Sequence, residues 1–343
     1  MAVKLKKEFE DFNSEIKIDT ETDHLIEKRD KLKEDIKKYL PDECEKFNLS
    51  VNKSDFRFLN QGSYKIGTTI HPIEGQSVDI DYAVILPVDI NEHTDPRQLK
   101  KAVRDSLSIK NIRIPKIKEP CVTVGYHSEG KEYMHIDFPI YADYDSNLYL
   151  ARGKENSLNP RWEIADPEGL VNYFRDKFSE NEQLKRIVRY IKKWKQEKYQ
   201  NSTNSHEVPP SVGLTVLACE NYIECTDDGD DDLSALYYTL ESIKNKFSIN
   251  ESKGEIENAS IICDLPVEPY SDIFYKMRDS SKHMITFYKR LSKAVDNLRE
   301  AMNIDDEHET AKYVVKVLGD EFNIPEKQAD SVVTSNKGEY CFG

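Results

Sequence analysis

Residues 58–87 read FLNQGSYKIGTTIHPIEGQSVDIDYAVILP and carry the strongest structural signal of the chain. The apolar run 82–86 follows two acids, Asp79 and Asp81, that are two residues apart. The alternation predicts a β-strand, in which both side chains lie on one face with Cβ atoms about 6.5–7 Å apart. Carboxylates this close repel each other unless a cation lies between them. The pair therefore predicts a site for Mg²⁺, which prefers hard oxygen ligands, with Mn²⁺ as the alternative.

A third acid is predicted from residues 133–141, which read YMHIDFPIY. This run also alternates, so His135 and Asp137 lie on the same face of a second predicted strand. A site that holds two metal ions about 3.5–4 Å apart needs a further carboxylate. We therefore expect Asp137 to join Asp79 and Asp81 as the catalytic, metal-binding residues.

The turn Gln61-Gly62-Ser63 comes before these acids and supplies groups suited to phosphate. Glycine lets backbone N–H groups approach a phosphate closely, and the Ser63 hydroxyl adds a donor. A Gly-Ser pair alone usually marks only a turn, and a D-x-D pair alone usually ends a solvated strand. Their combination, G-S-(x15)-D-x-D followed by a second acidic strand, favours a nucleotide site.

The order G-S, D-x-D and D resembles that of the DNA polymerase β-type nucleotidyltransferases. Within them, residues 58–218 resemble the DncV-like subgroup of the bacterial CD-NTases. These are relatives of cGAS that make cyclic oligonucleotides in the anti-phage defence called CBASS. The segments that carry the resemblance are QGSYKIGTTIHP (61–72), SVDIDYAVILP (77–87), MHIDFPIYAD (134–143), RWEIADPEGLVNYF (161–174) and RYIKKWK (189–195).

The resemblance implies an α+β fold with two lobes, a polymerase β-like core with a mixed sheet and a mainly helical second lobe. It implies an enzyme that condenses NTPs, ATP or GTP or both, into a cyclic di- or trinucleotide with release of pyrophosphate. In the family, a lysine and a serine of the second lobe contact the nucleotide. The matching residues are Lys192, in RYIKKW, and Ser211, in PPSVG.

The chain divides by pattern into four predicted parts. Asp166-Pro167-Glu168 marks the start of a helix, because Asp suits the N-cap and Pro the first helical position. Two polar segments, 226–232 and 249–260, are expected to be a solvated acidic loop and a mobile connection. The predicted parts are an N-terminal helical segment packing on the core (1–50), the catalytic lobe (51–165), an OAS-like helical lobe (166–333) and a flexible tail (334–343).

Composition limits the partners and the compartment. The 343 residues carry 63 acidic and 49 basic side chains, a net charge of −14, which opposes constitutive binding to nucleic acid. We expect no membrane span, because no apolar run approaches about 20 residues, and no signal peptide, because the N-terminus lacks an apolar core. The six cysteines show no C-x-x-C spacing, which favours reduced thiols and a cytoplasmic protein.

Two other functions are compatible with the same residues. A linear nucleotidyltransferase acting on RNA ends or on a small molecule would share the three acids and differ in its acceptor. A catalytically inactive binding or scaffold protein would not need them, so the presence of all three argues against that function. A nucleic-acid-activated sensor like cGAS needs a His/Cys zinc cluster, and the sequence has none.

The last residues, Tyr340-Cys341-Phe342-Gly343, follow the last helical pattern and are expected to be accessible. Some CD-NTase operons encode E1/E2-like partners that ligate the terminal glycine of the synthase to targets. The resemblance therefore implies that Gly343 is a conjugation site for an E1/E2-like ligase.

Overall fold

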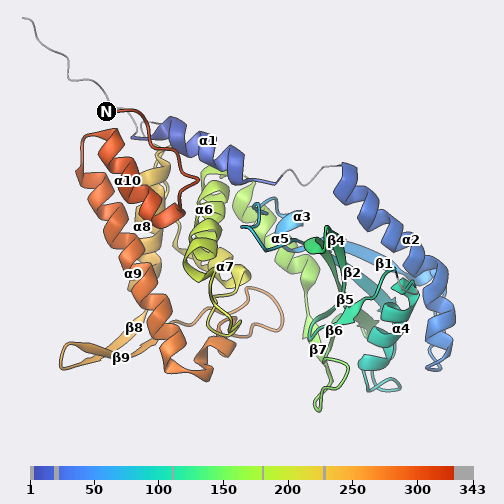
Figure 1. The fold of residues 1–343 in the computed structure, drawn as a ribbon. Helices are drawn as coiled ribbons and strands as arrows, with labels where there is room; N and C mark the ends of the chain where they lie inside the picture. Colours follow the sequence, from blue (N-terminus) through green and yellow to red (C-terminus); the bar gives the residue numbers. More distant parts are fainter. Residues whose placement is uncertain (1–3, 19–22, 110–111, 180, 227–228, 328–343) are drawn as a thin grey trace, which may run out of the picture.

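The computed structural model shows a sheet lobe and a helical lobe side by side (Figure 1). The mixed α+β, two-lobed fold that the sequence predicts is confirmed, because a mixed sheet and a mainly helical second half are both present. Gly343, the predicted conjugation site, lies outside the described residues. The structure describes residues 4–18, 23–109, 112–179, 181–226 and 229–327.

A mixed sheet forms the first lobe. Within the described residues it has seven strands in the order β1-β2-β5-β4-β3, and β6 joins β5 to β7. The central pair, β2 and β5, is parallel, whereas β1 and β4 flank it in antiparallel orientation. The strands are β1 (Arg57–Gln61), β2 (Val78–Pro87), β3 (Lys116–Ile117), β4 (Cys121–Ser128), β5 (Lys131–Tyr144), β6 (Asn147–Arg152) and β7 (Arg161–Ala165).

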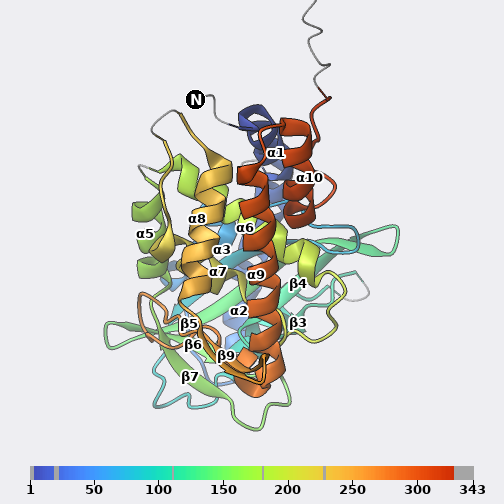
Figure 2. The same ribbon diagram turned by 90° about the vertical axis from the view of Figure 1, so that its left-hand side faces the viewer.

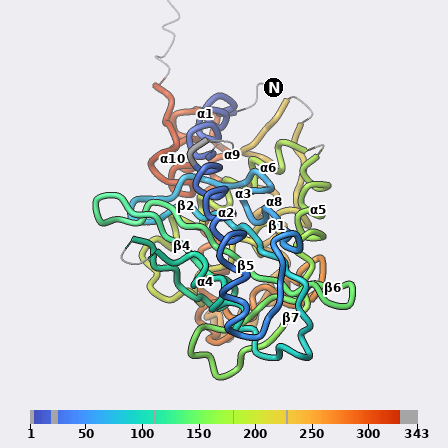
Figure 3. Tube along the Cα trace, turned by 90° about the vertical axis from the view of Figure 1, so that its right-hand side faces the viewer, coloured from blue at the N-terminus to red at the C-terminus, as the bar shows by residue number. Residues whose placement is uncertain are grey.

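Alternation along β2 and β5 separates the two faces of this sheet. Apolar residues such as Ile80, Val84 and Ile136 are buried on one face. Two helices, α2 (Asp23–Glu45) and α4 (Arg97–Leu107), pack with this face on the side away from the helical lobe (Figures 1 and 3). The opposite face carries the acids and turns toward the helical lobe.

Helices dominate the second lobe, where α8, α9 and α10 lie side by side (Figures 1 and 2). The predicted helix start at Asp166 is confirmed, because its carboxylate accepts a hydrogen bond from the backbone N–H of Gly169. Residues expected to be a mobile connection instead form a hairpin of two strands, β8 (Ser248–Ser252) and β9 (Glu255–Ser260). The helices are α5 (Pro167–Phe178), α6 (Glu182–Tyr199), α7 (Ser211–Asn221), α8 (Asp232–Asn245), α9 (Ser281–Asn303) and α10 (Glu307–Leu318).

The N-terminal segment contacts both lobes. Whereas α2 packs on the sheet lobe, α1 (Lys6–Ile16) packs into the core of the helical lobe. Beyond α1, the backbone N–H of His71 donates to the Ile16 carbonyl at 2.8 Å, and that of Ile18 donates to the Thr69 carbonyl at 3.2 Å. The end of α1 is therefore hydrogen-bonded to the segment that follows the predicted phosphate turn.

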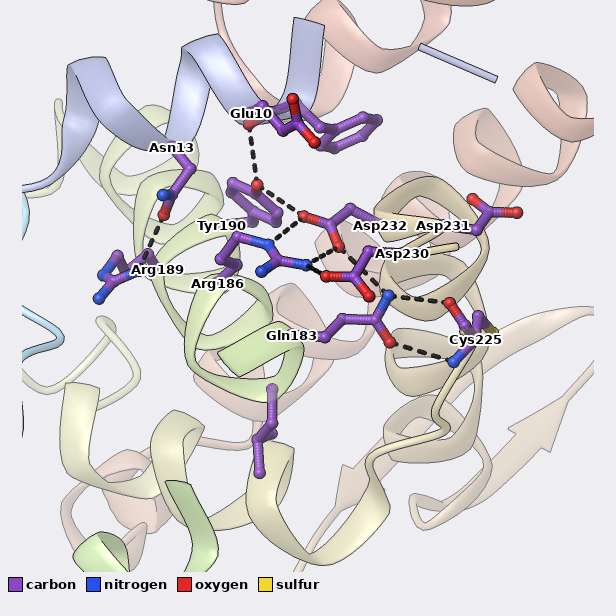
Figure 4. Close-up of polar contacts among 12 residues, drawn as sticks. Glu10, Asn13, Gln183, Arg186, Arg189, Tyr190, Cys225, Asp230, Asp231 and Asp232 are labelled. Atoms are coloured by element: carbon purple, nitrogen blue, oxygen red, sulfur yellow. Dashed lines mark hydrogen bonds and ion pairs between the residues drawn. The ribbon is translucent and has the colours of Figure 1, made fainter. Parts of the chain in front are cut away.

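A buried polar network fixes α1 on the helical lobe (Figure 4). Arg186 of α6 donates to Asp232 at 2.7 Å and to Asp230 at 2.6 Å. The Tyr190 hydroxyl lies 2.9 Å from the Asp232 carboxylate and 3.0 Å from the carbonyl of Phe9 in α1. The acidic segment expected to be solvated thus contains a buried acid, which is tolerated because a guanidinium balances its charge.

The described helices include none with the length and apolar character needed to cross a bilayer.

Candidate active site

A cleft of about 1040 Å³ lies between the two lobes. A concave site lined by apolar surface and a few convergent polar groups is where a small ligand is expected. Asp137 is absent from the lining of the cleft and lies on β5 beside Asp81. The other predicted catalytic and nucleotide-binding residues all line it, namely Gln61, Gly62, Ser63, Asp79, Asp81, Lys192 and Ser211.

The pairing of β2 with β5 brings the acids together. In this parallel register, Asp81 is the partner of Asp137 and Asp79 is the partner of His135. All four side chains belong to the same face of the sheet because they are two residues apart on neighbouring strands. Candidate ligand atoms of Asp79, His135 and Asp137 lie within 4.8 Å of one another. The sequence placed His135 beside Asp137 without assigning it a role.

Asp81 is the most perturbed acid in this group. It is half-buried on the floor of the cleft, and burial raises the pKa of its carboxyl to about 8, with the neighbouring charges of Asp79 and Asp137 adding to the shift. A carboxylate in such a position is costly to ionise unless a cation compensates it. Asp79, His135 and Asp137 offer two carboxylates and one imidazole that are close enough to fit one divalent metal ion, and Asp81 adds a carboxylate beside Asp137.

Neighbouring strands hold Asp137 in place. The Thr123 hydroxyl on β4 donates to Asp137 Oδ1 at 2.5 Å, and Lys118 Nζ lies 3.3 Å from both carboxylate oxygens. Thr123 is the register partner of Asp137, so the sheet itself places this donor. Lys118 brings positive charge to the edge of the acidic group.

Gly62 is required by the approach of Asp81. Its φ of +66° is in the left-handed region, and a Cβ built there would lie 2.0 Å from Asp81 Oδ2. Glycine therefore permits both the turn after β1 and the close contact of that turn with the acid. The Ser63 hydroxyl, one residue on, lies 3.1 Å from the Thr69 hydroxyl.

The helical lobe contributes two lysines to the opposite wall, in different environments. Lys192 is buried and donates to the carbonyl and hydroxyl of Thr68 at 3.1 and 2.8 Å, and burial lowers its pKa to about 7. Lys195 donates to the Ser211 hydroxyl at 2.7 Å, and burial lowers its pKa to about 8. The structure thus pairs Ser211 with Lys195, which the sequence did not single out, and not with Lys192. The two lysines are three residues apart and share one side of α6, so helical periodicity alone does not indicate which of them pairs with Ser211.

We predict that Asp81 makes the stability of the metal-free protein fall as pH rises. Its folded pKa of about 8 lies above an ordinary value of about 3.9, so its protonated form stabilises the fold fully below about pH 4. That contribution is lost as pH rises through about 8. With EDTA present, Asp81→Asn should therefore melt about 2 °C or more above the wild type at pH 8, and the gap should close toward pH 5.

The measurement is thermal unfolding followed by circular dichroism from pH 5 to 8.5. Asp143→Asn is the matched control, because Asp143 lies on the same face of β5 but forms an exposed ion pair with Arg57. Equal pH dependence in Asp81→Asn and the wild type would contradict the assignment of this shift to Asp81.

Comparison with known proteins supports a nucleotidyltransferase fold. Residues 56–141 match the family described as the nucleotidyltransferase domain of DncV-like cyclic GMP-AMP synthase. A cyclic GMP-AMP synthase of Escherichia albertii is 34% identical over 178 residues, which are 49% of this chain and 37% of that enzyme. A c-di-GMP synthase of Roseivirga ehrenbergii is 24% identical over 305 residues, or 80% of this chain and 75% of that enzyme.

Solved structures of Vibrio cholerae DncV share the fold over almost the whole chain. The complex with nonhydrolyzable GTP superimposes with a TM-score of 0.67 and 16% identity, covering 94% of this chain and 97% of DncV. The complex with the linear intermediate pppA(3′,5′)pG gives a TM-score of 0.66 with the same coverage and identity. Residues 56–141 thus match a DncV-like nucleotidyltransferase domain, and the chain as a whole is similar to the two synthases and shares the fold of DncV.

Proposed function

We propose that this protein condenses NTPs into a cyclic di- or trinucleotide that serves as a second messenger in anti-phage defence. The observation that carries the proposal is the convergence of Asp79, Asp81 and Asp137 on one face of the sheet, opposite a wall with Lys195 and Ser211. Acids on one side and a cation on the other suit a metal-bound triphosphate. The related synthases named above make products from purine nucleotides, which favours ATP or GTP or both as substrates.

In this proposal the chain positions the reacting groups. Asp79 and Asp81 would hold a metal ion that binds the triphosphate of the incoming nucleotide, and all three acids would hold a second metal ion for the acceptor hydroxyl. Gly62 leaves room for Asp81, and Ser63 offers a hydroxyl to the phosphates. The hydrogen bond from Thr123 fixes the orientation of Asp137. The strand register sets the three acids and Thr123 before substrate binds, so little reorganisation of these groups is needed at the moment of reaction.

Held by these acids, Mg²⁺ or Mn²⁺ would lower the pKa of the acceptor ribose hydroxyl and would neutralise charge on the transferred phosphoryl group. Lys195 adds positive charge at the other wall of the cleft. Attack of the ribose oxygen on the α-phosphorus forms the new phosphodiester bond and breaks the bond to pyrophosphate, which leaves. A second, equivalent step on the turned linear product closes the ring.

The test is incubation of the purified protein with the four labelled NTPs and Mg²⁺ or Mn²⁺, followed by mass spectrometry after phosphatase treatment. We expect a phosphatase-resistant cyclic product and release of pyrophosphate. Asp79→Asn, Asp81→Asn and Asp137→Asn should each lower turnover by at least about 100-fold, because several kcal/mol of transition-state stabilisation is lost.

Asp143→Asn is again the matched control and should stay within about twofold of the wild type. A product that phosphatase degrades would indicate a linear nucleotidyltransferase. No pyrophosphate release from any NTP mixture would indicate an inactive binding or scaffold protein, and either result would overturn the proposal.

The pairing of Lys195 with Ser211 gives a separate prediction about substrate affinity. Lys195→Met should raise the KM for NTP about tenfold or more with a smaller effect on kcat, because a charge-assisted hydrogen bond to phosphate is lost. Lys198→Met, one turn further along α6 and hydrogen-bonded to the Lys316 carbonyl, is the control that keeps the cleft unchanged. An unchanged KM in Lys195→Met would show that this lysine does not contact the nucleotide.

A further inference from the structure

His135 lies inside the group of acids. Its Nε2 atom is 3.2 Å from Asp79 Oδ1, and its ring is mostly buried in the sheet face. Two ligands next to each other around an octahedral ion are about 3 Å apart when each metal–ligand bond is about 2.1 Å. The separation of Nε2 from the carboxylate oxygen is therefore the separation that two ligands of one ion would have.

The other ring nitrogen faces hydrogen-bonding partners. His135 Nδ1 lies 2.8 Å from the Ser77 hydroxyl and 3.3 Å from Glu132 Oε1. Ser77 and Glu132 hold the Nδ1 side of the ring, so that Nε2 faces Asp79, with which a protonated imidazole forms an ion pair. A metal ion bound between Nε2 and Asp79 would take the place of that proton. Metal-binding imidazoles are held in this way by a carboxylate on the nitrogen away from the metal.

The neighbouring strand β4 leaves space for the Glu132 carboxylate. Gly125 on β4 is the register partner of His135, and a Cβ at this position would lie 2.4 Å from Glu132 Oε2. Any larger residue would push Glu132 away from its place beside the imidazole. The glycine, the acid and the histidine thus form one arrangement across β4 and β5.

We propose that His135 is a direct metal ligand alongside Asp79 and Asp137. This inference rests on the metal site of the proposed function and deepens it. A set of oxygen ligands alone suits Mg²⁺, whereas an imidazole nitrogen favours a first-row transition metal. The mixed set therefore gives the site a preference for Mn²⁺ over Mg²⁺, and Glu132 acts as a positioning residue for His135.

The experiment uses the full chain labelled with ¹⁵N-histidine, loaded with Mn²⁺ and a non-hydrolysable NTP of natural isotopic composition. Electron-nuclear double resonance at Mn²⁺ should detect the ¹⁵N coupling of a directly bound imidazole, distinct from the ¹⁴N of the nucleotide. The coupling should be lost in His135→Gln. It should persist in His308→Gln, the control, because His308 lies on α10 of the helical lobe, where its Nδ1 is 2.8 Å from the Pro325 carbonyl.

Titration of Mn²⁺ and Mg²⁺ supplies a second readout. His135→Gln should weaken Mn²⁺ binding about tenfold or more and Mg²⁺ binding by less, and Glu132→Gln should weaken Mn²⁺ binding by about tenfold. Bound Mn²⁺ without ¹⁵N coupling in the wild type, no Mn²⁺ binding at all, or equal coupling in His135→Gln would overturn the inference. A cyclic product from the NTP assay with no ¹⁵N coupling would remove His135 from the site and leave the proposed function standing. A ¹⁵N coupling in the wild type, without any cyclic product in the NTP assay, would support His135 as a metal ligand and overturn the proposed function.

Discussion

Repulsion among carboxylates on one sheet face is the constraint on which the site depends. The parallel pairing of β2 with β5 places Asp81 beside Asp137 and Asp79 beside His135, so that negative charge is concentrated at the floor of the cleft. The protein alone compensates this charge only in part, through His135, which lies 3.2 Å from Asp79, and through Lys118 at the edge of the group. The raised pKa of Asp81 reflects the remaining free-energy cost of ionising its carboxyl group, and a bound divalent cation would remove that cost. The same face is thus poorly stabilised when empty and well suited to a metal-bound substrate.

The helical lobe completes the cleft, and several polar contacts hold it to the loop that follows the predicted phosphate turn. Lys192 donates to Thr68, and Arg189 donates to the Gly67 carbonyl at 2.7 Å and to Asn13 of α1 at 2.9 Å. Lys192 is therefore engaged in joining the lobes, which leaves Lys195 as the lysine next to Ser211. Because α1 is bonded to the same loop, the N-terminal segment takes part in fixing the width of the cleft.

Much of this arrangement follows from local patterns in the sequence. Alternation identified the shared face of Asp79 and Asp81, because side chains two residues apart in a strand must lie together. The pairing of Lys195 with Ser211 was missed, because it depends on how α6 and α7 pack. The burial of Asp232 was missed for a similar reason, since its partner Arg186 is 46 residues earlier in the chain. The Lys253-Gly254 pair was the sequence signal available for the hairpin β8–β9, because a turn of this kind favours glycine. Both residues have positive φ in the structure.

The most direct test of a metal-dependent nucleotidyl-transfer site is the anomalous scattering of Mn²⁺ in crystals of the full chain with a non-hydrolysable NTP. We expect anomalous peaks about 2.0–2.2 Å from carboxylate oxygens of Asp79, Asp81 and Asp137, with the triphosphate extending toward Lys195. Peaks confined to other acidic parts of the surface, or a triphosphate bound away from these three acids, would contradict it.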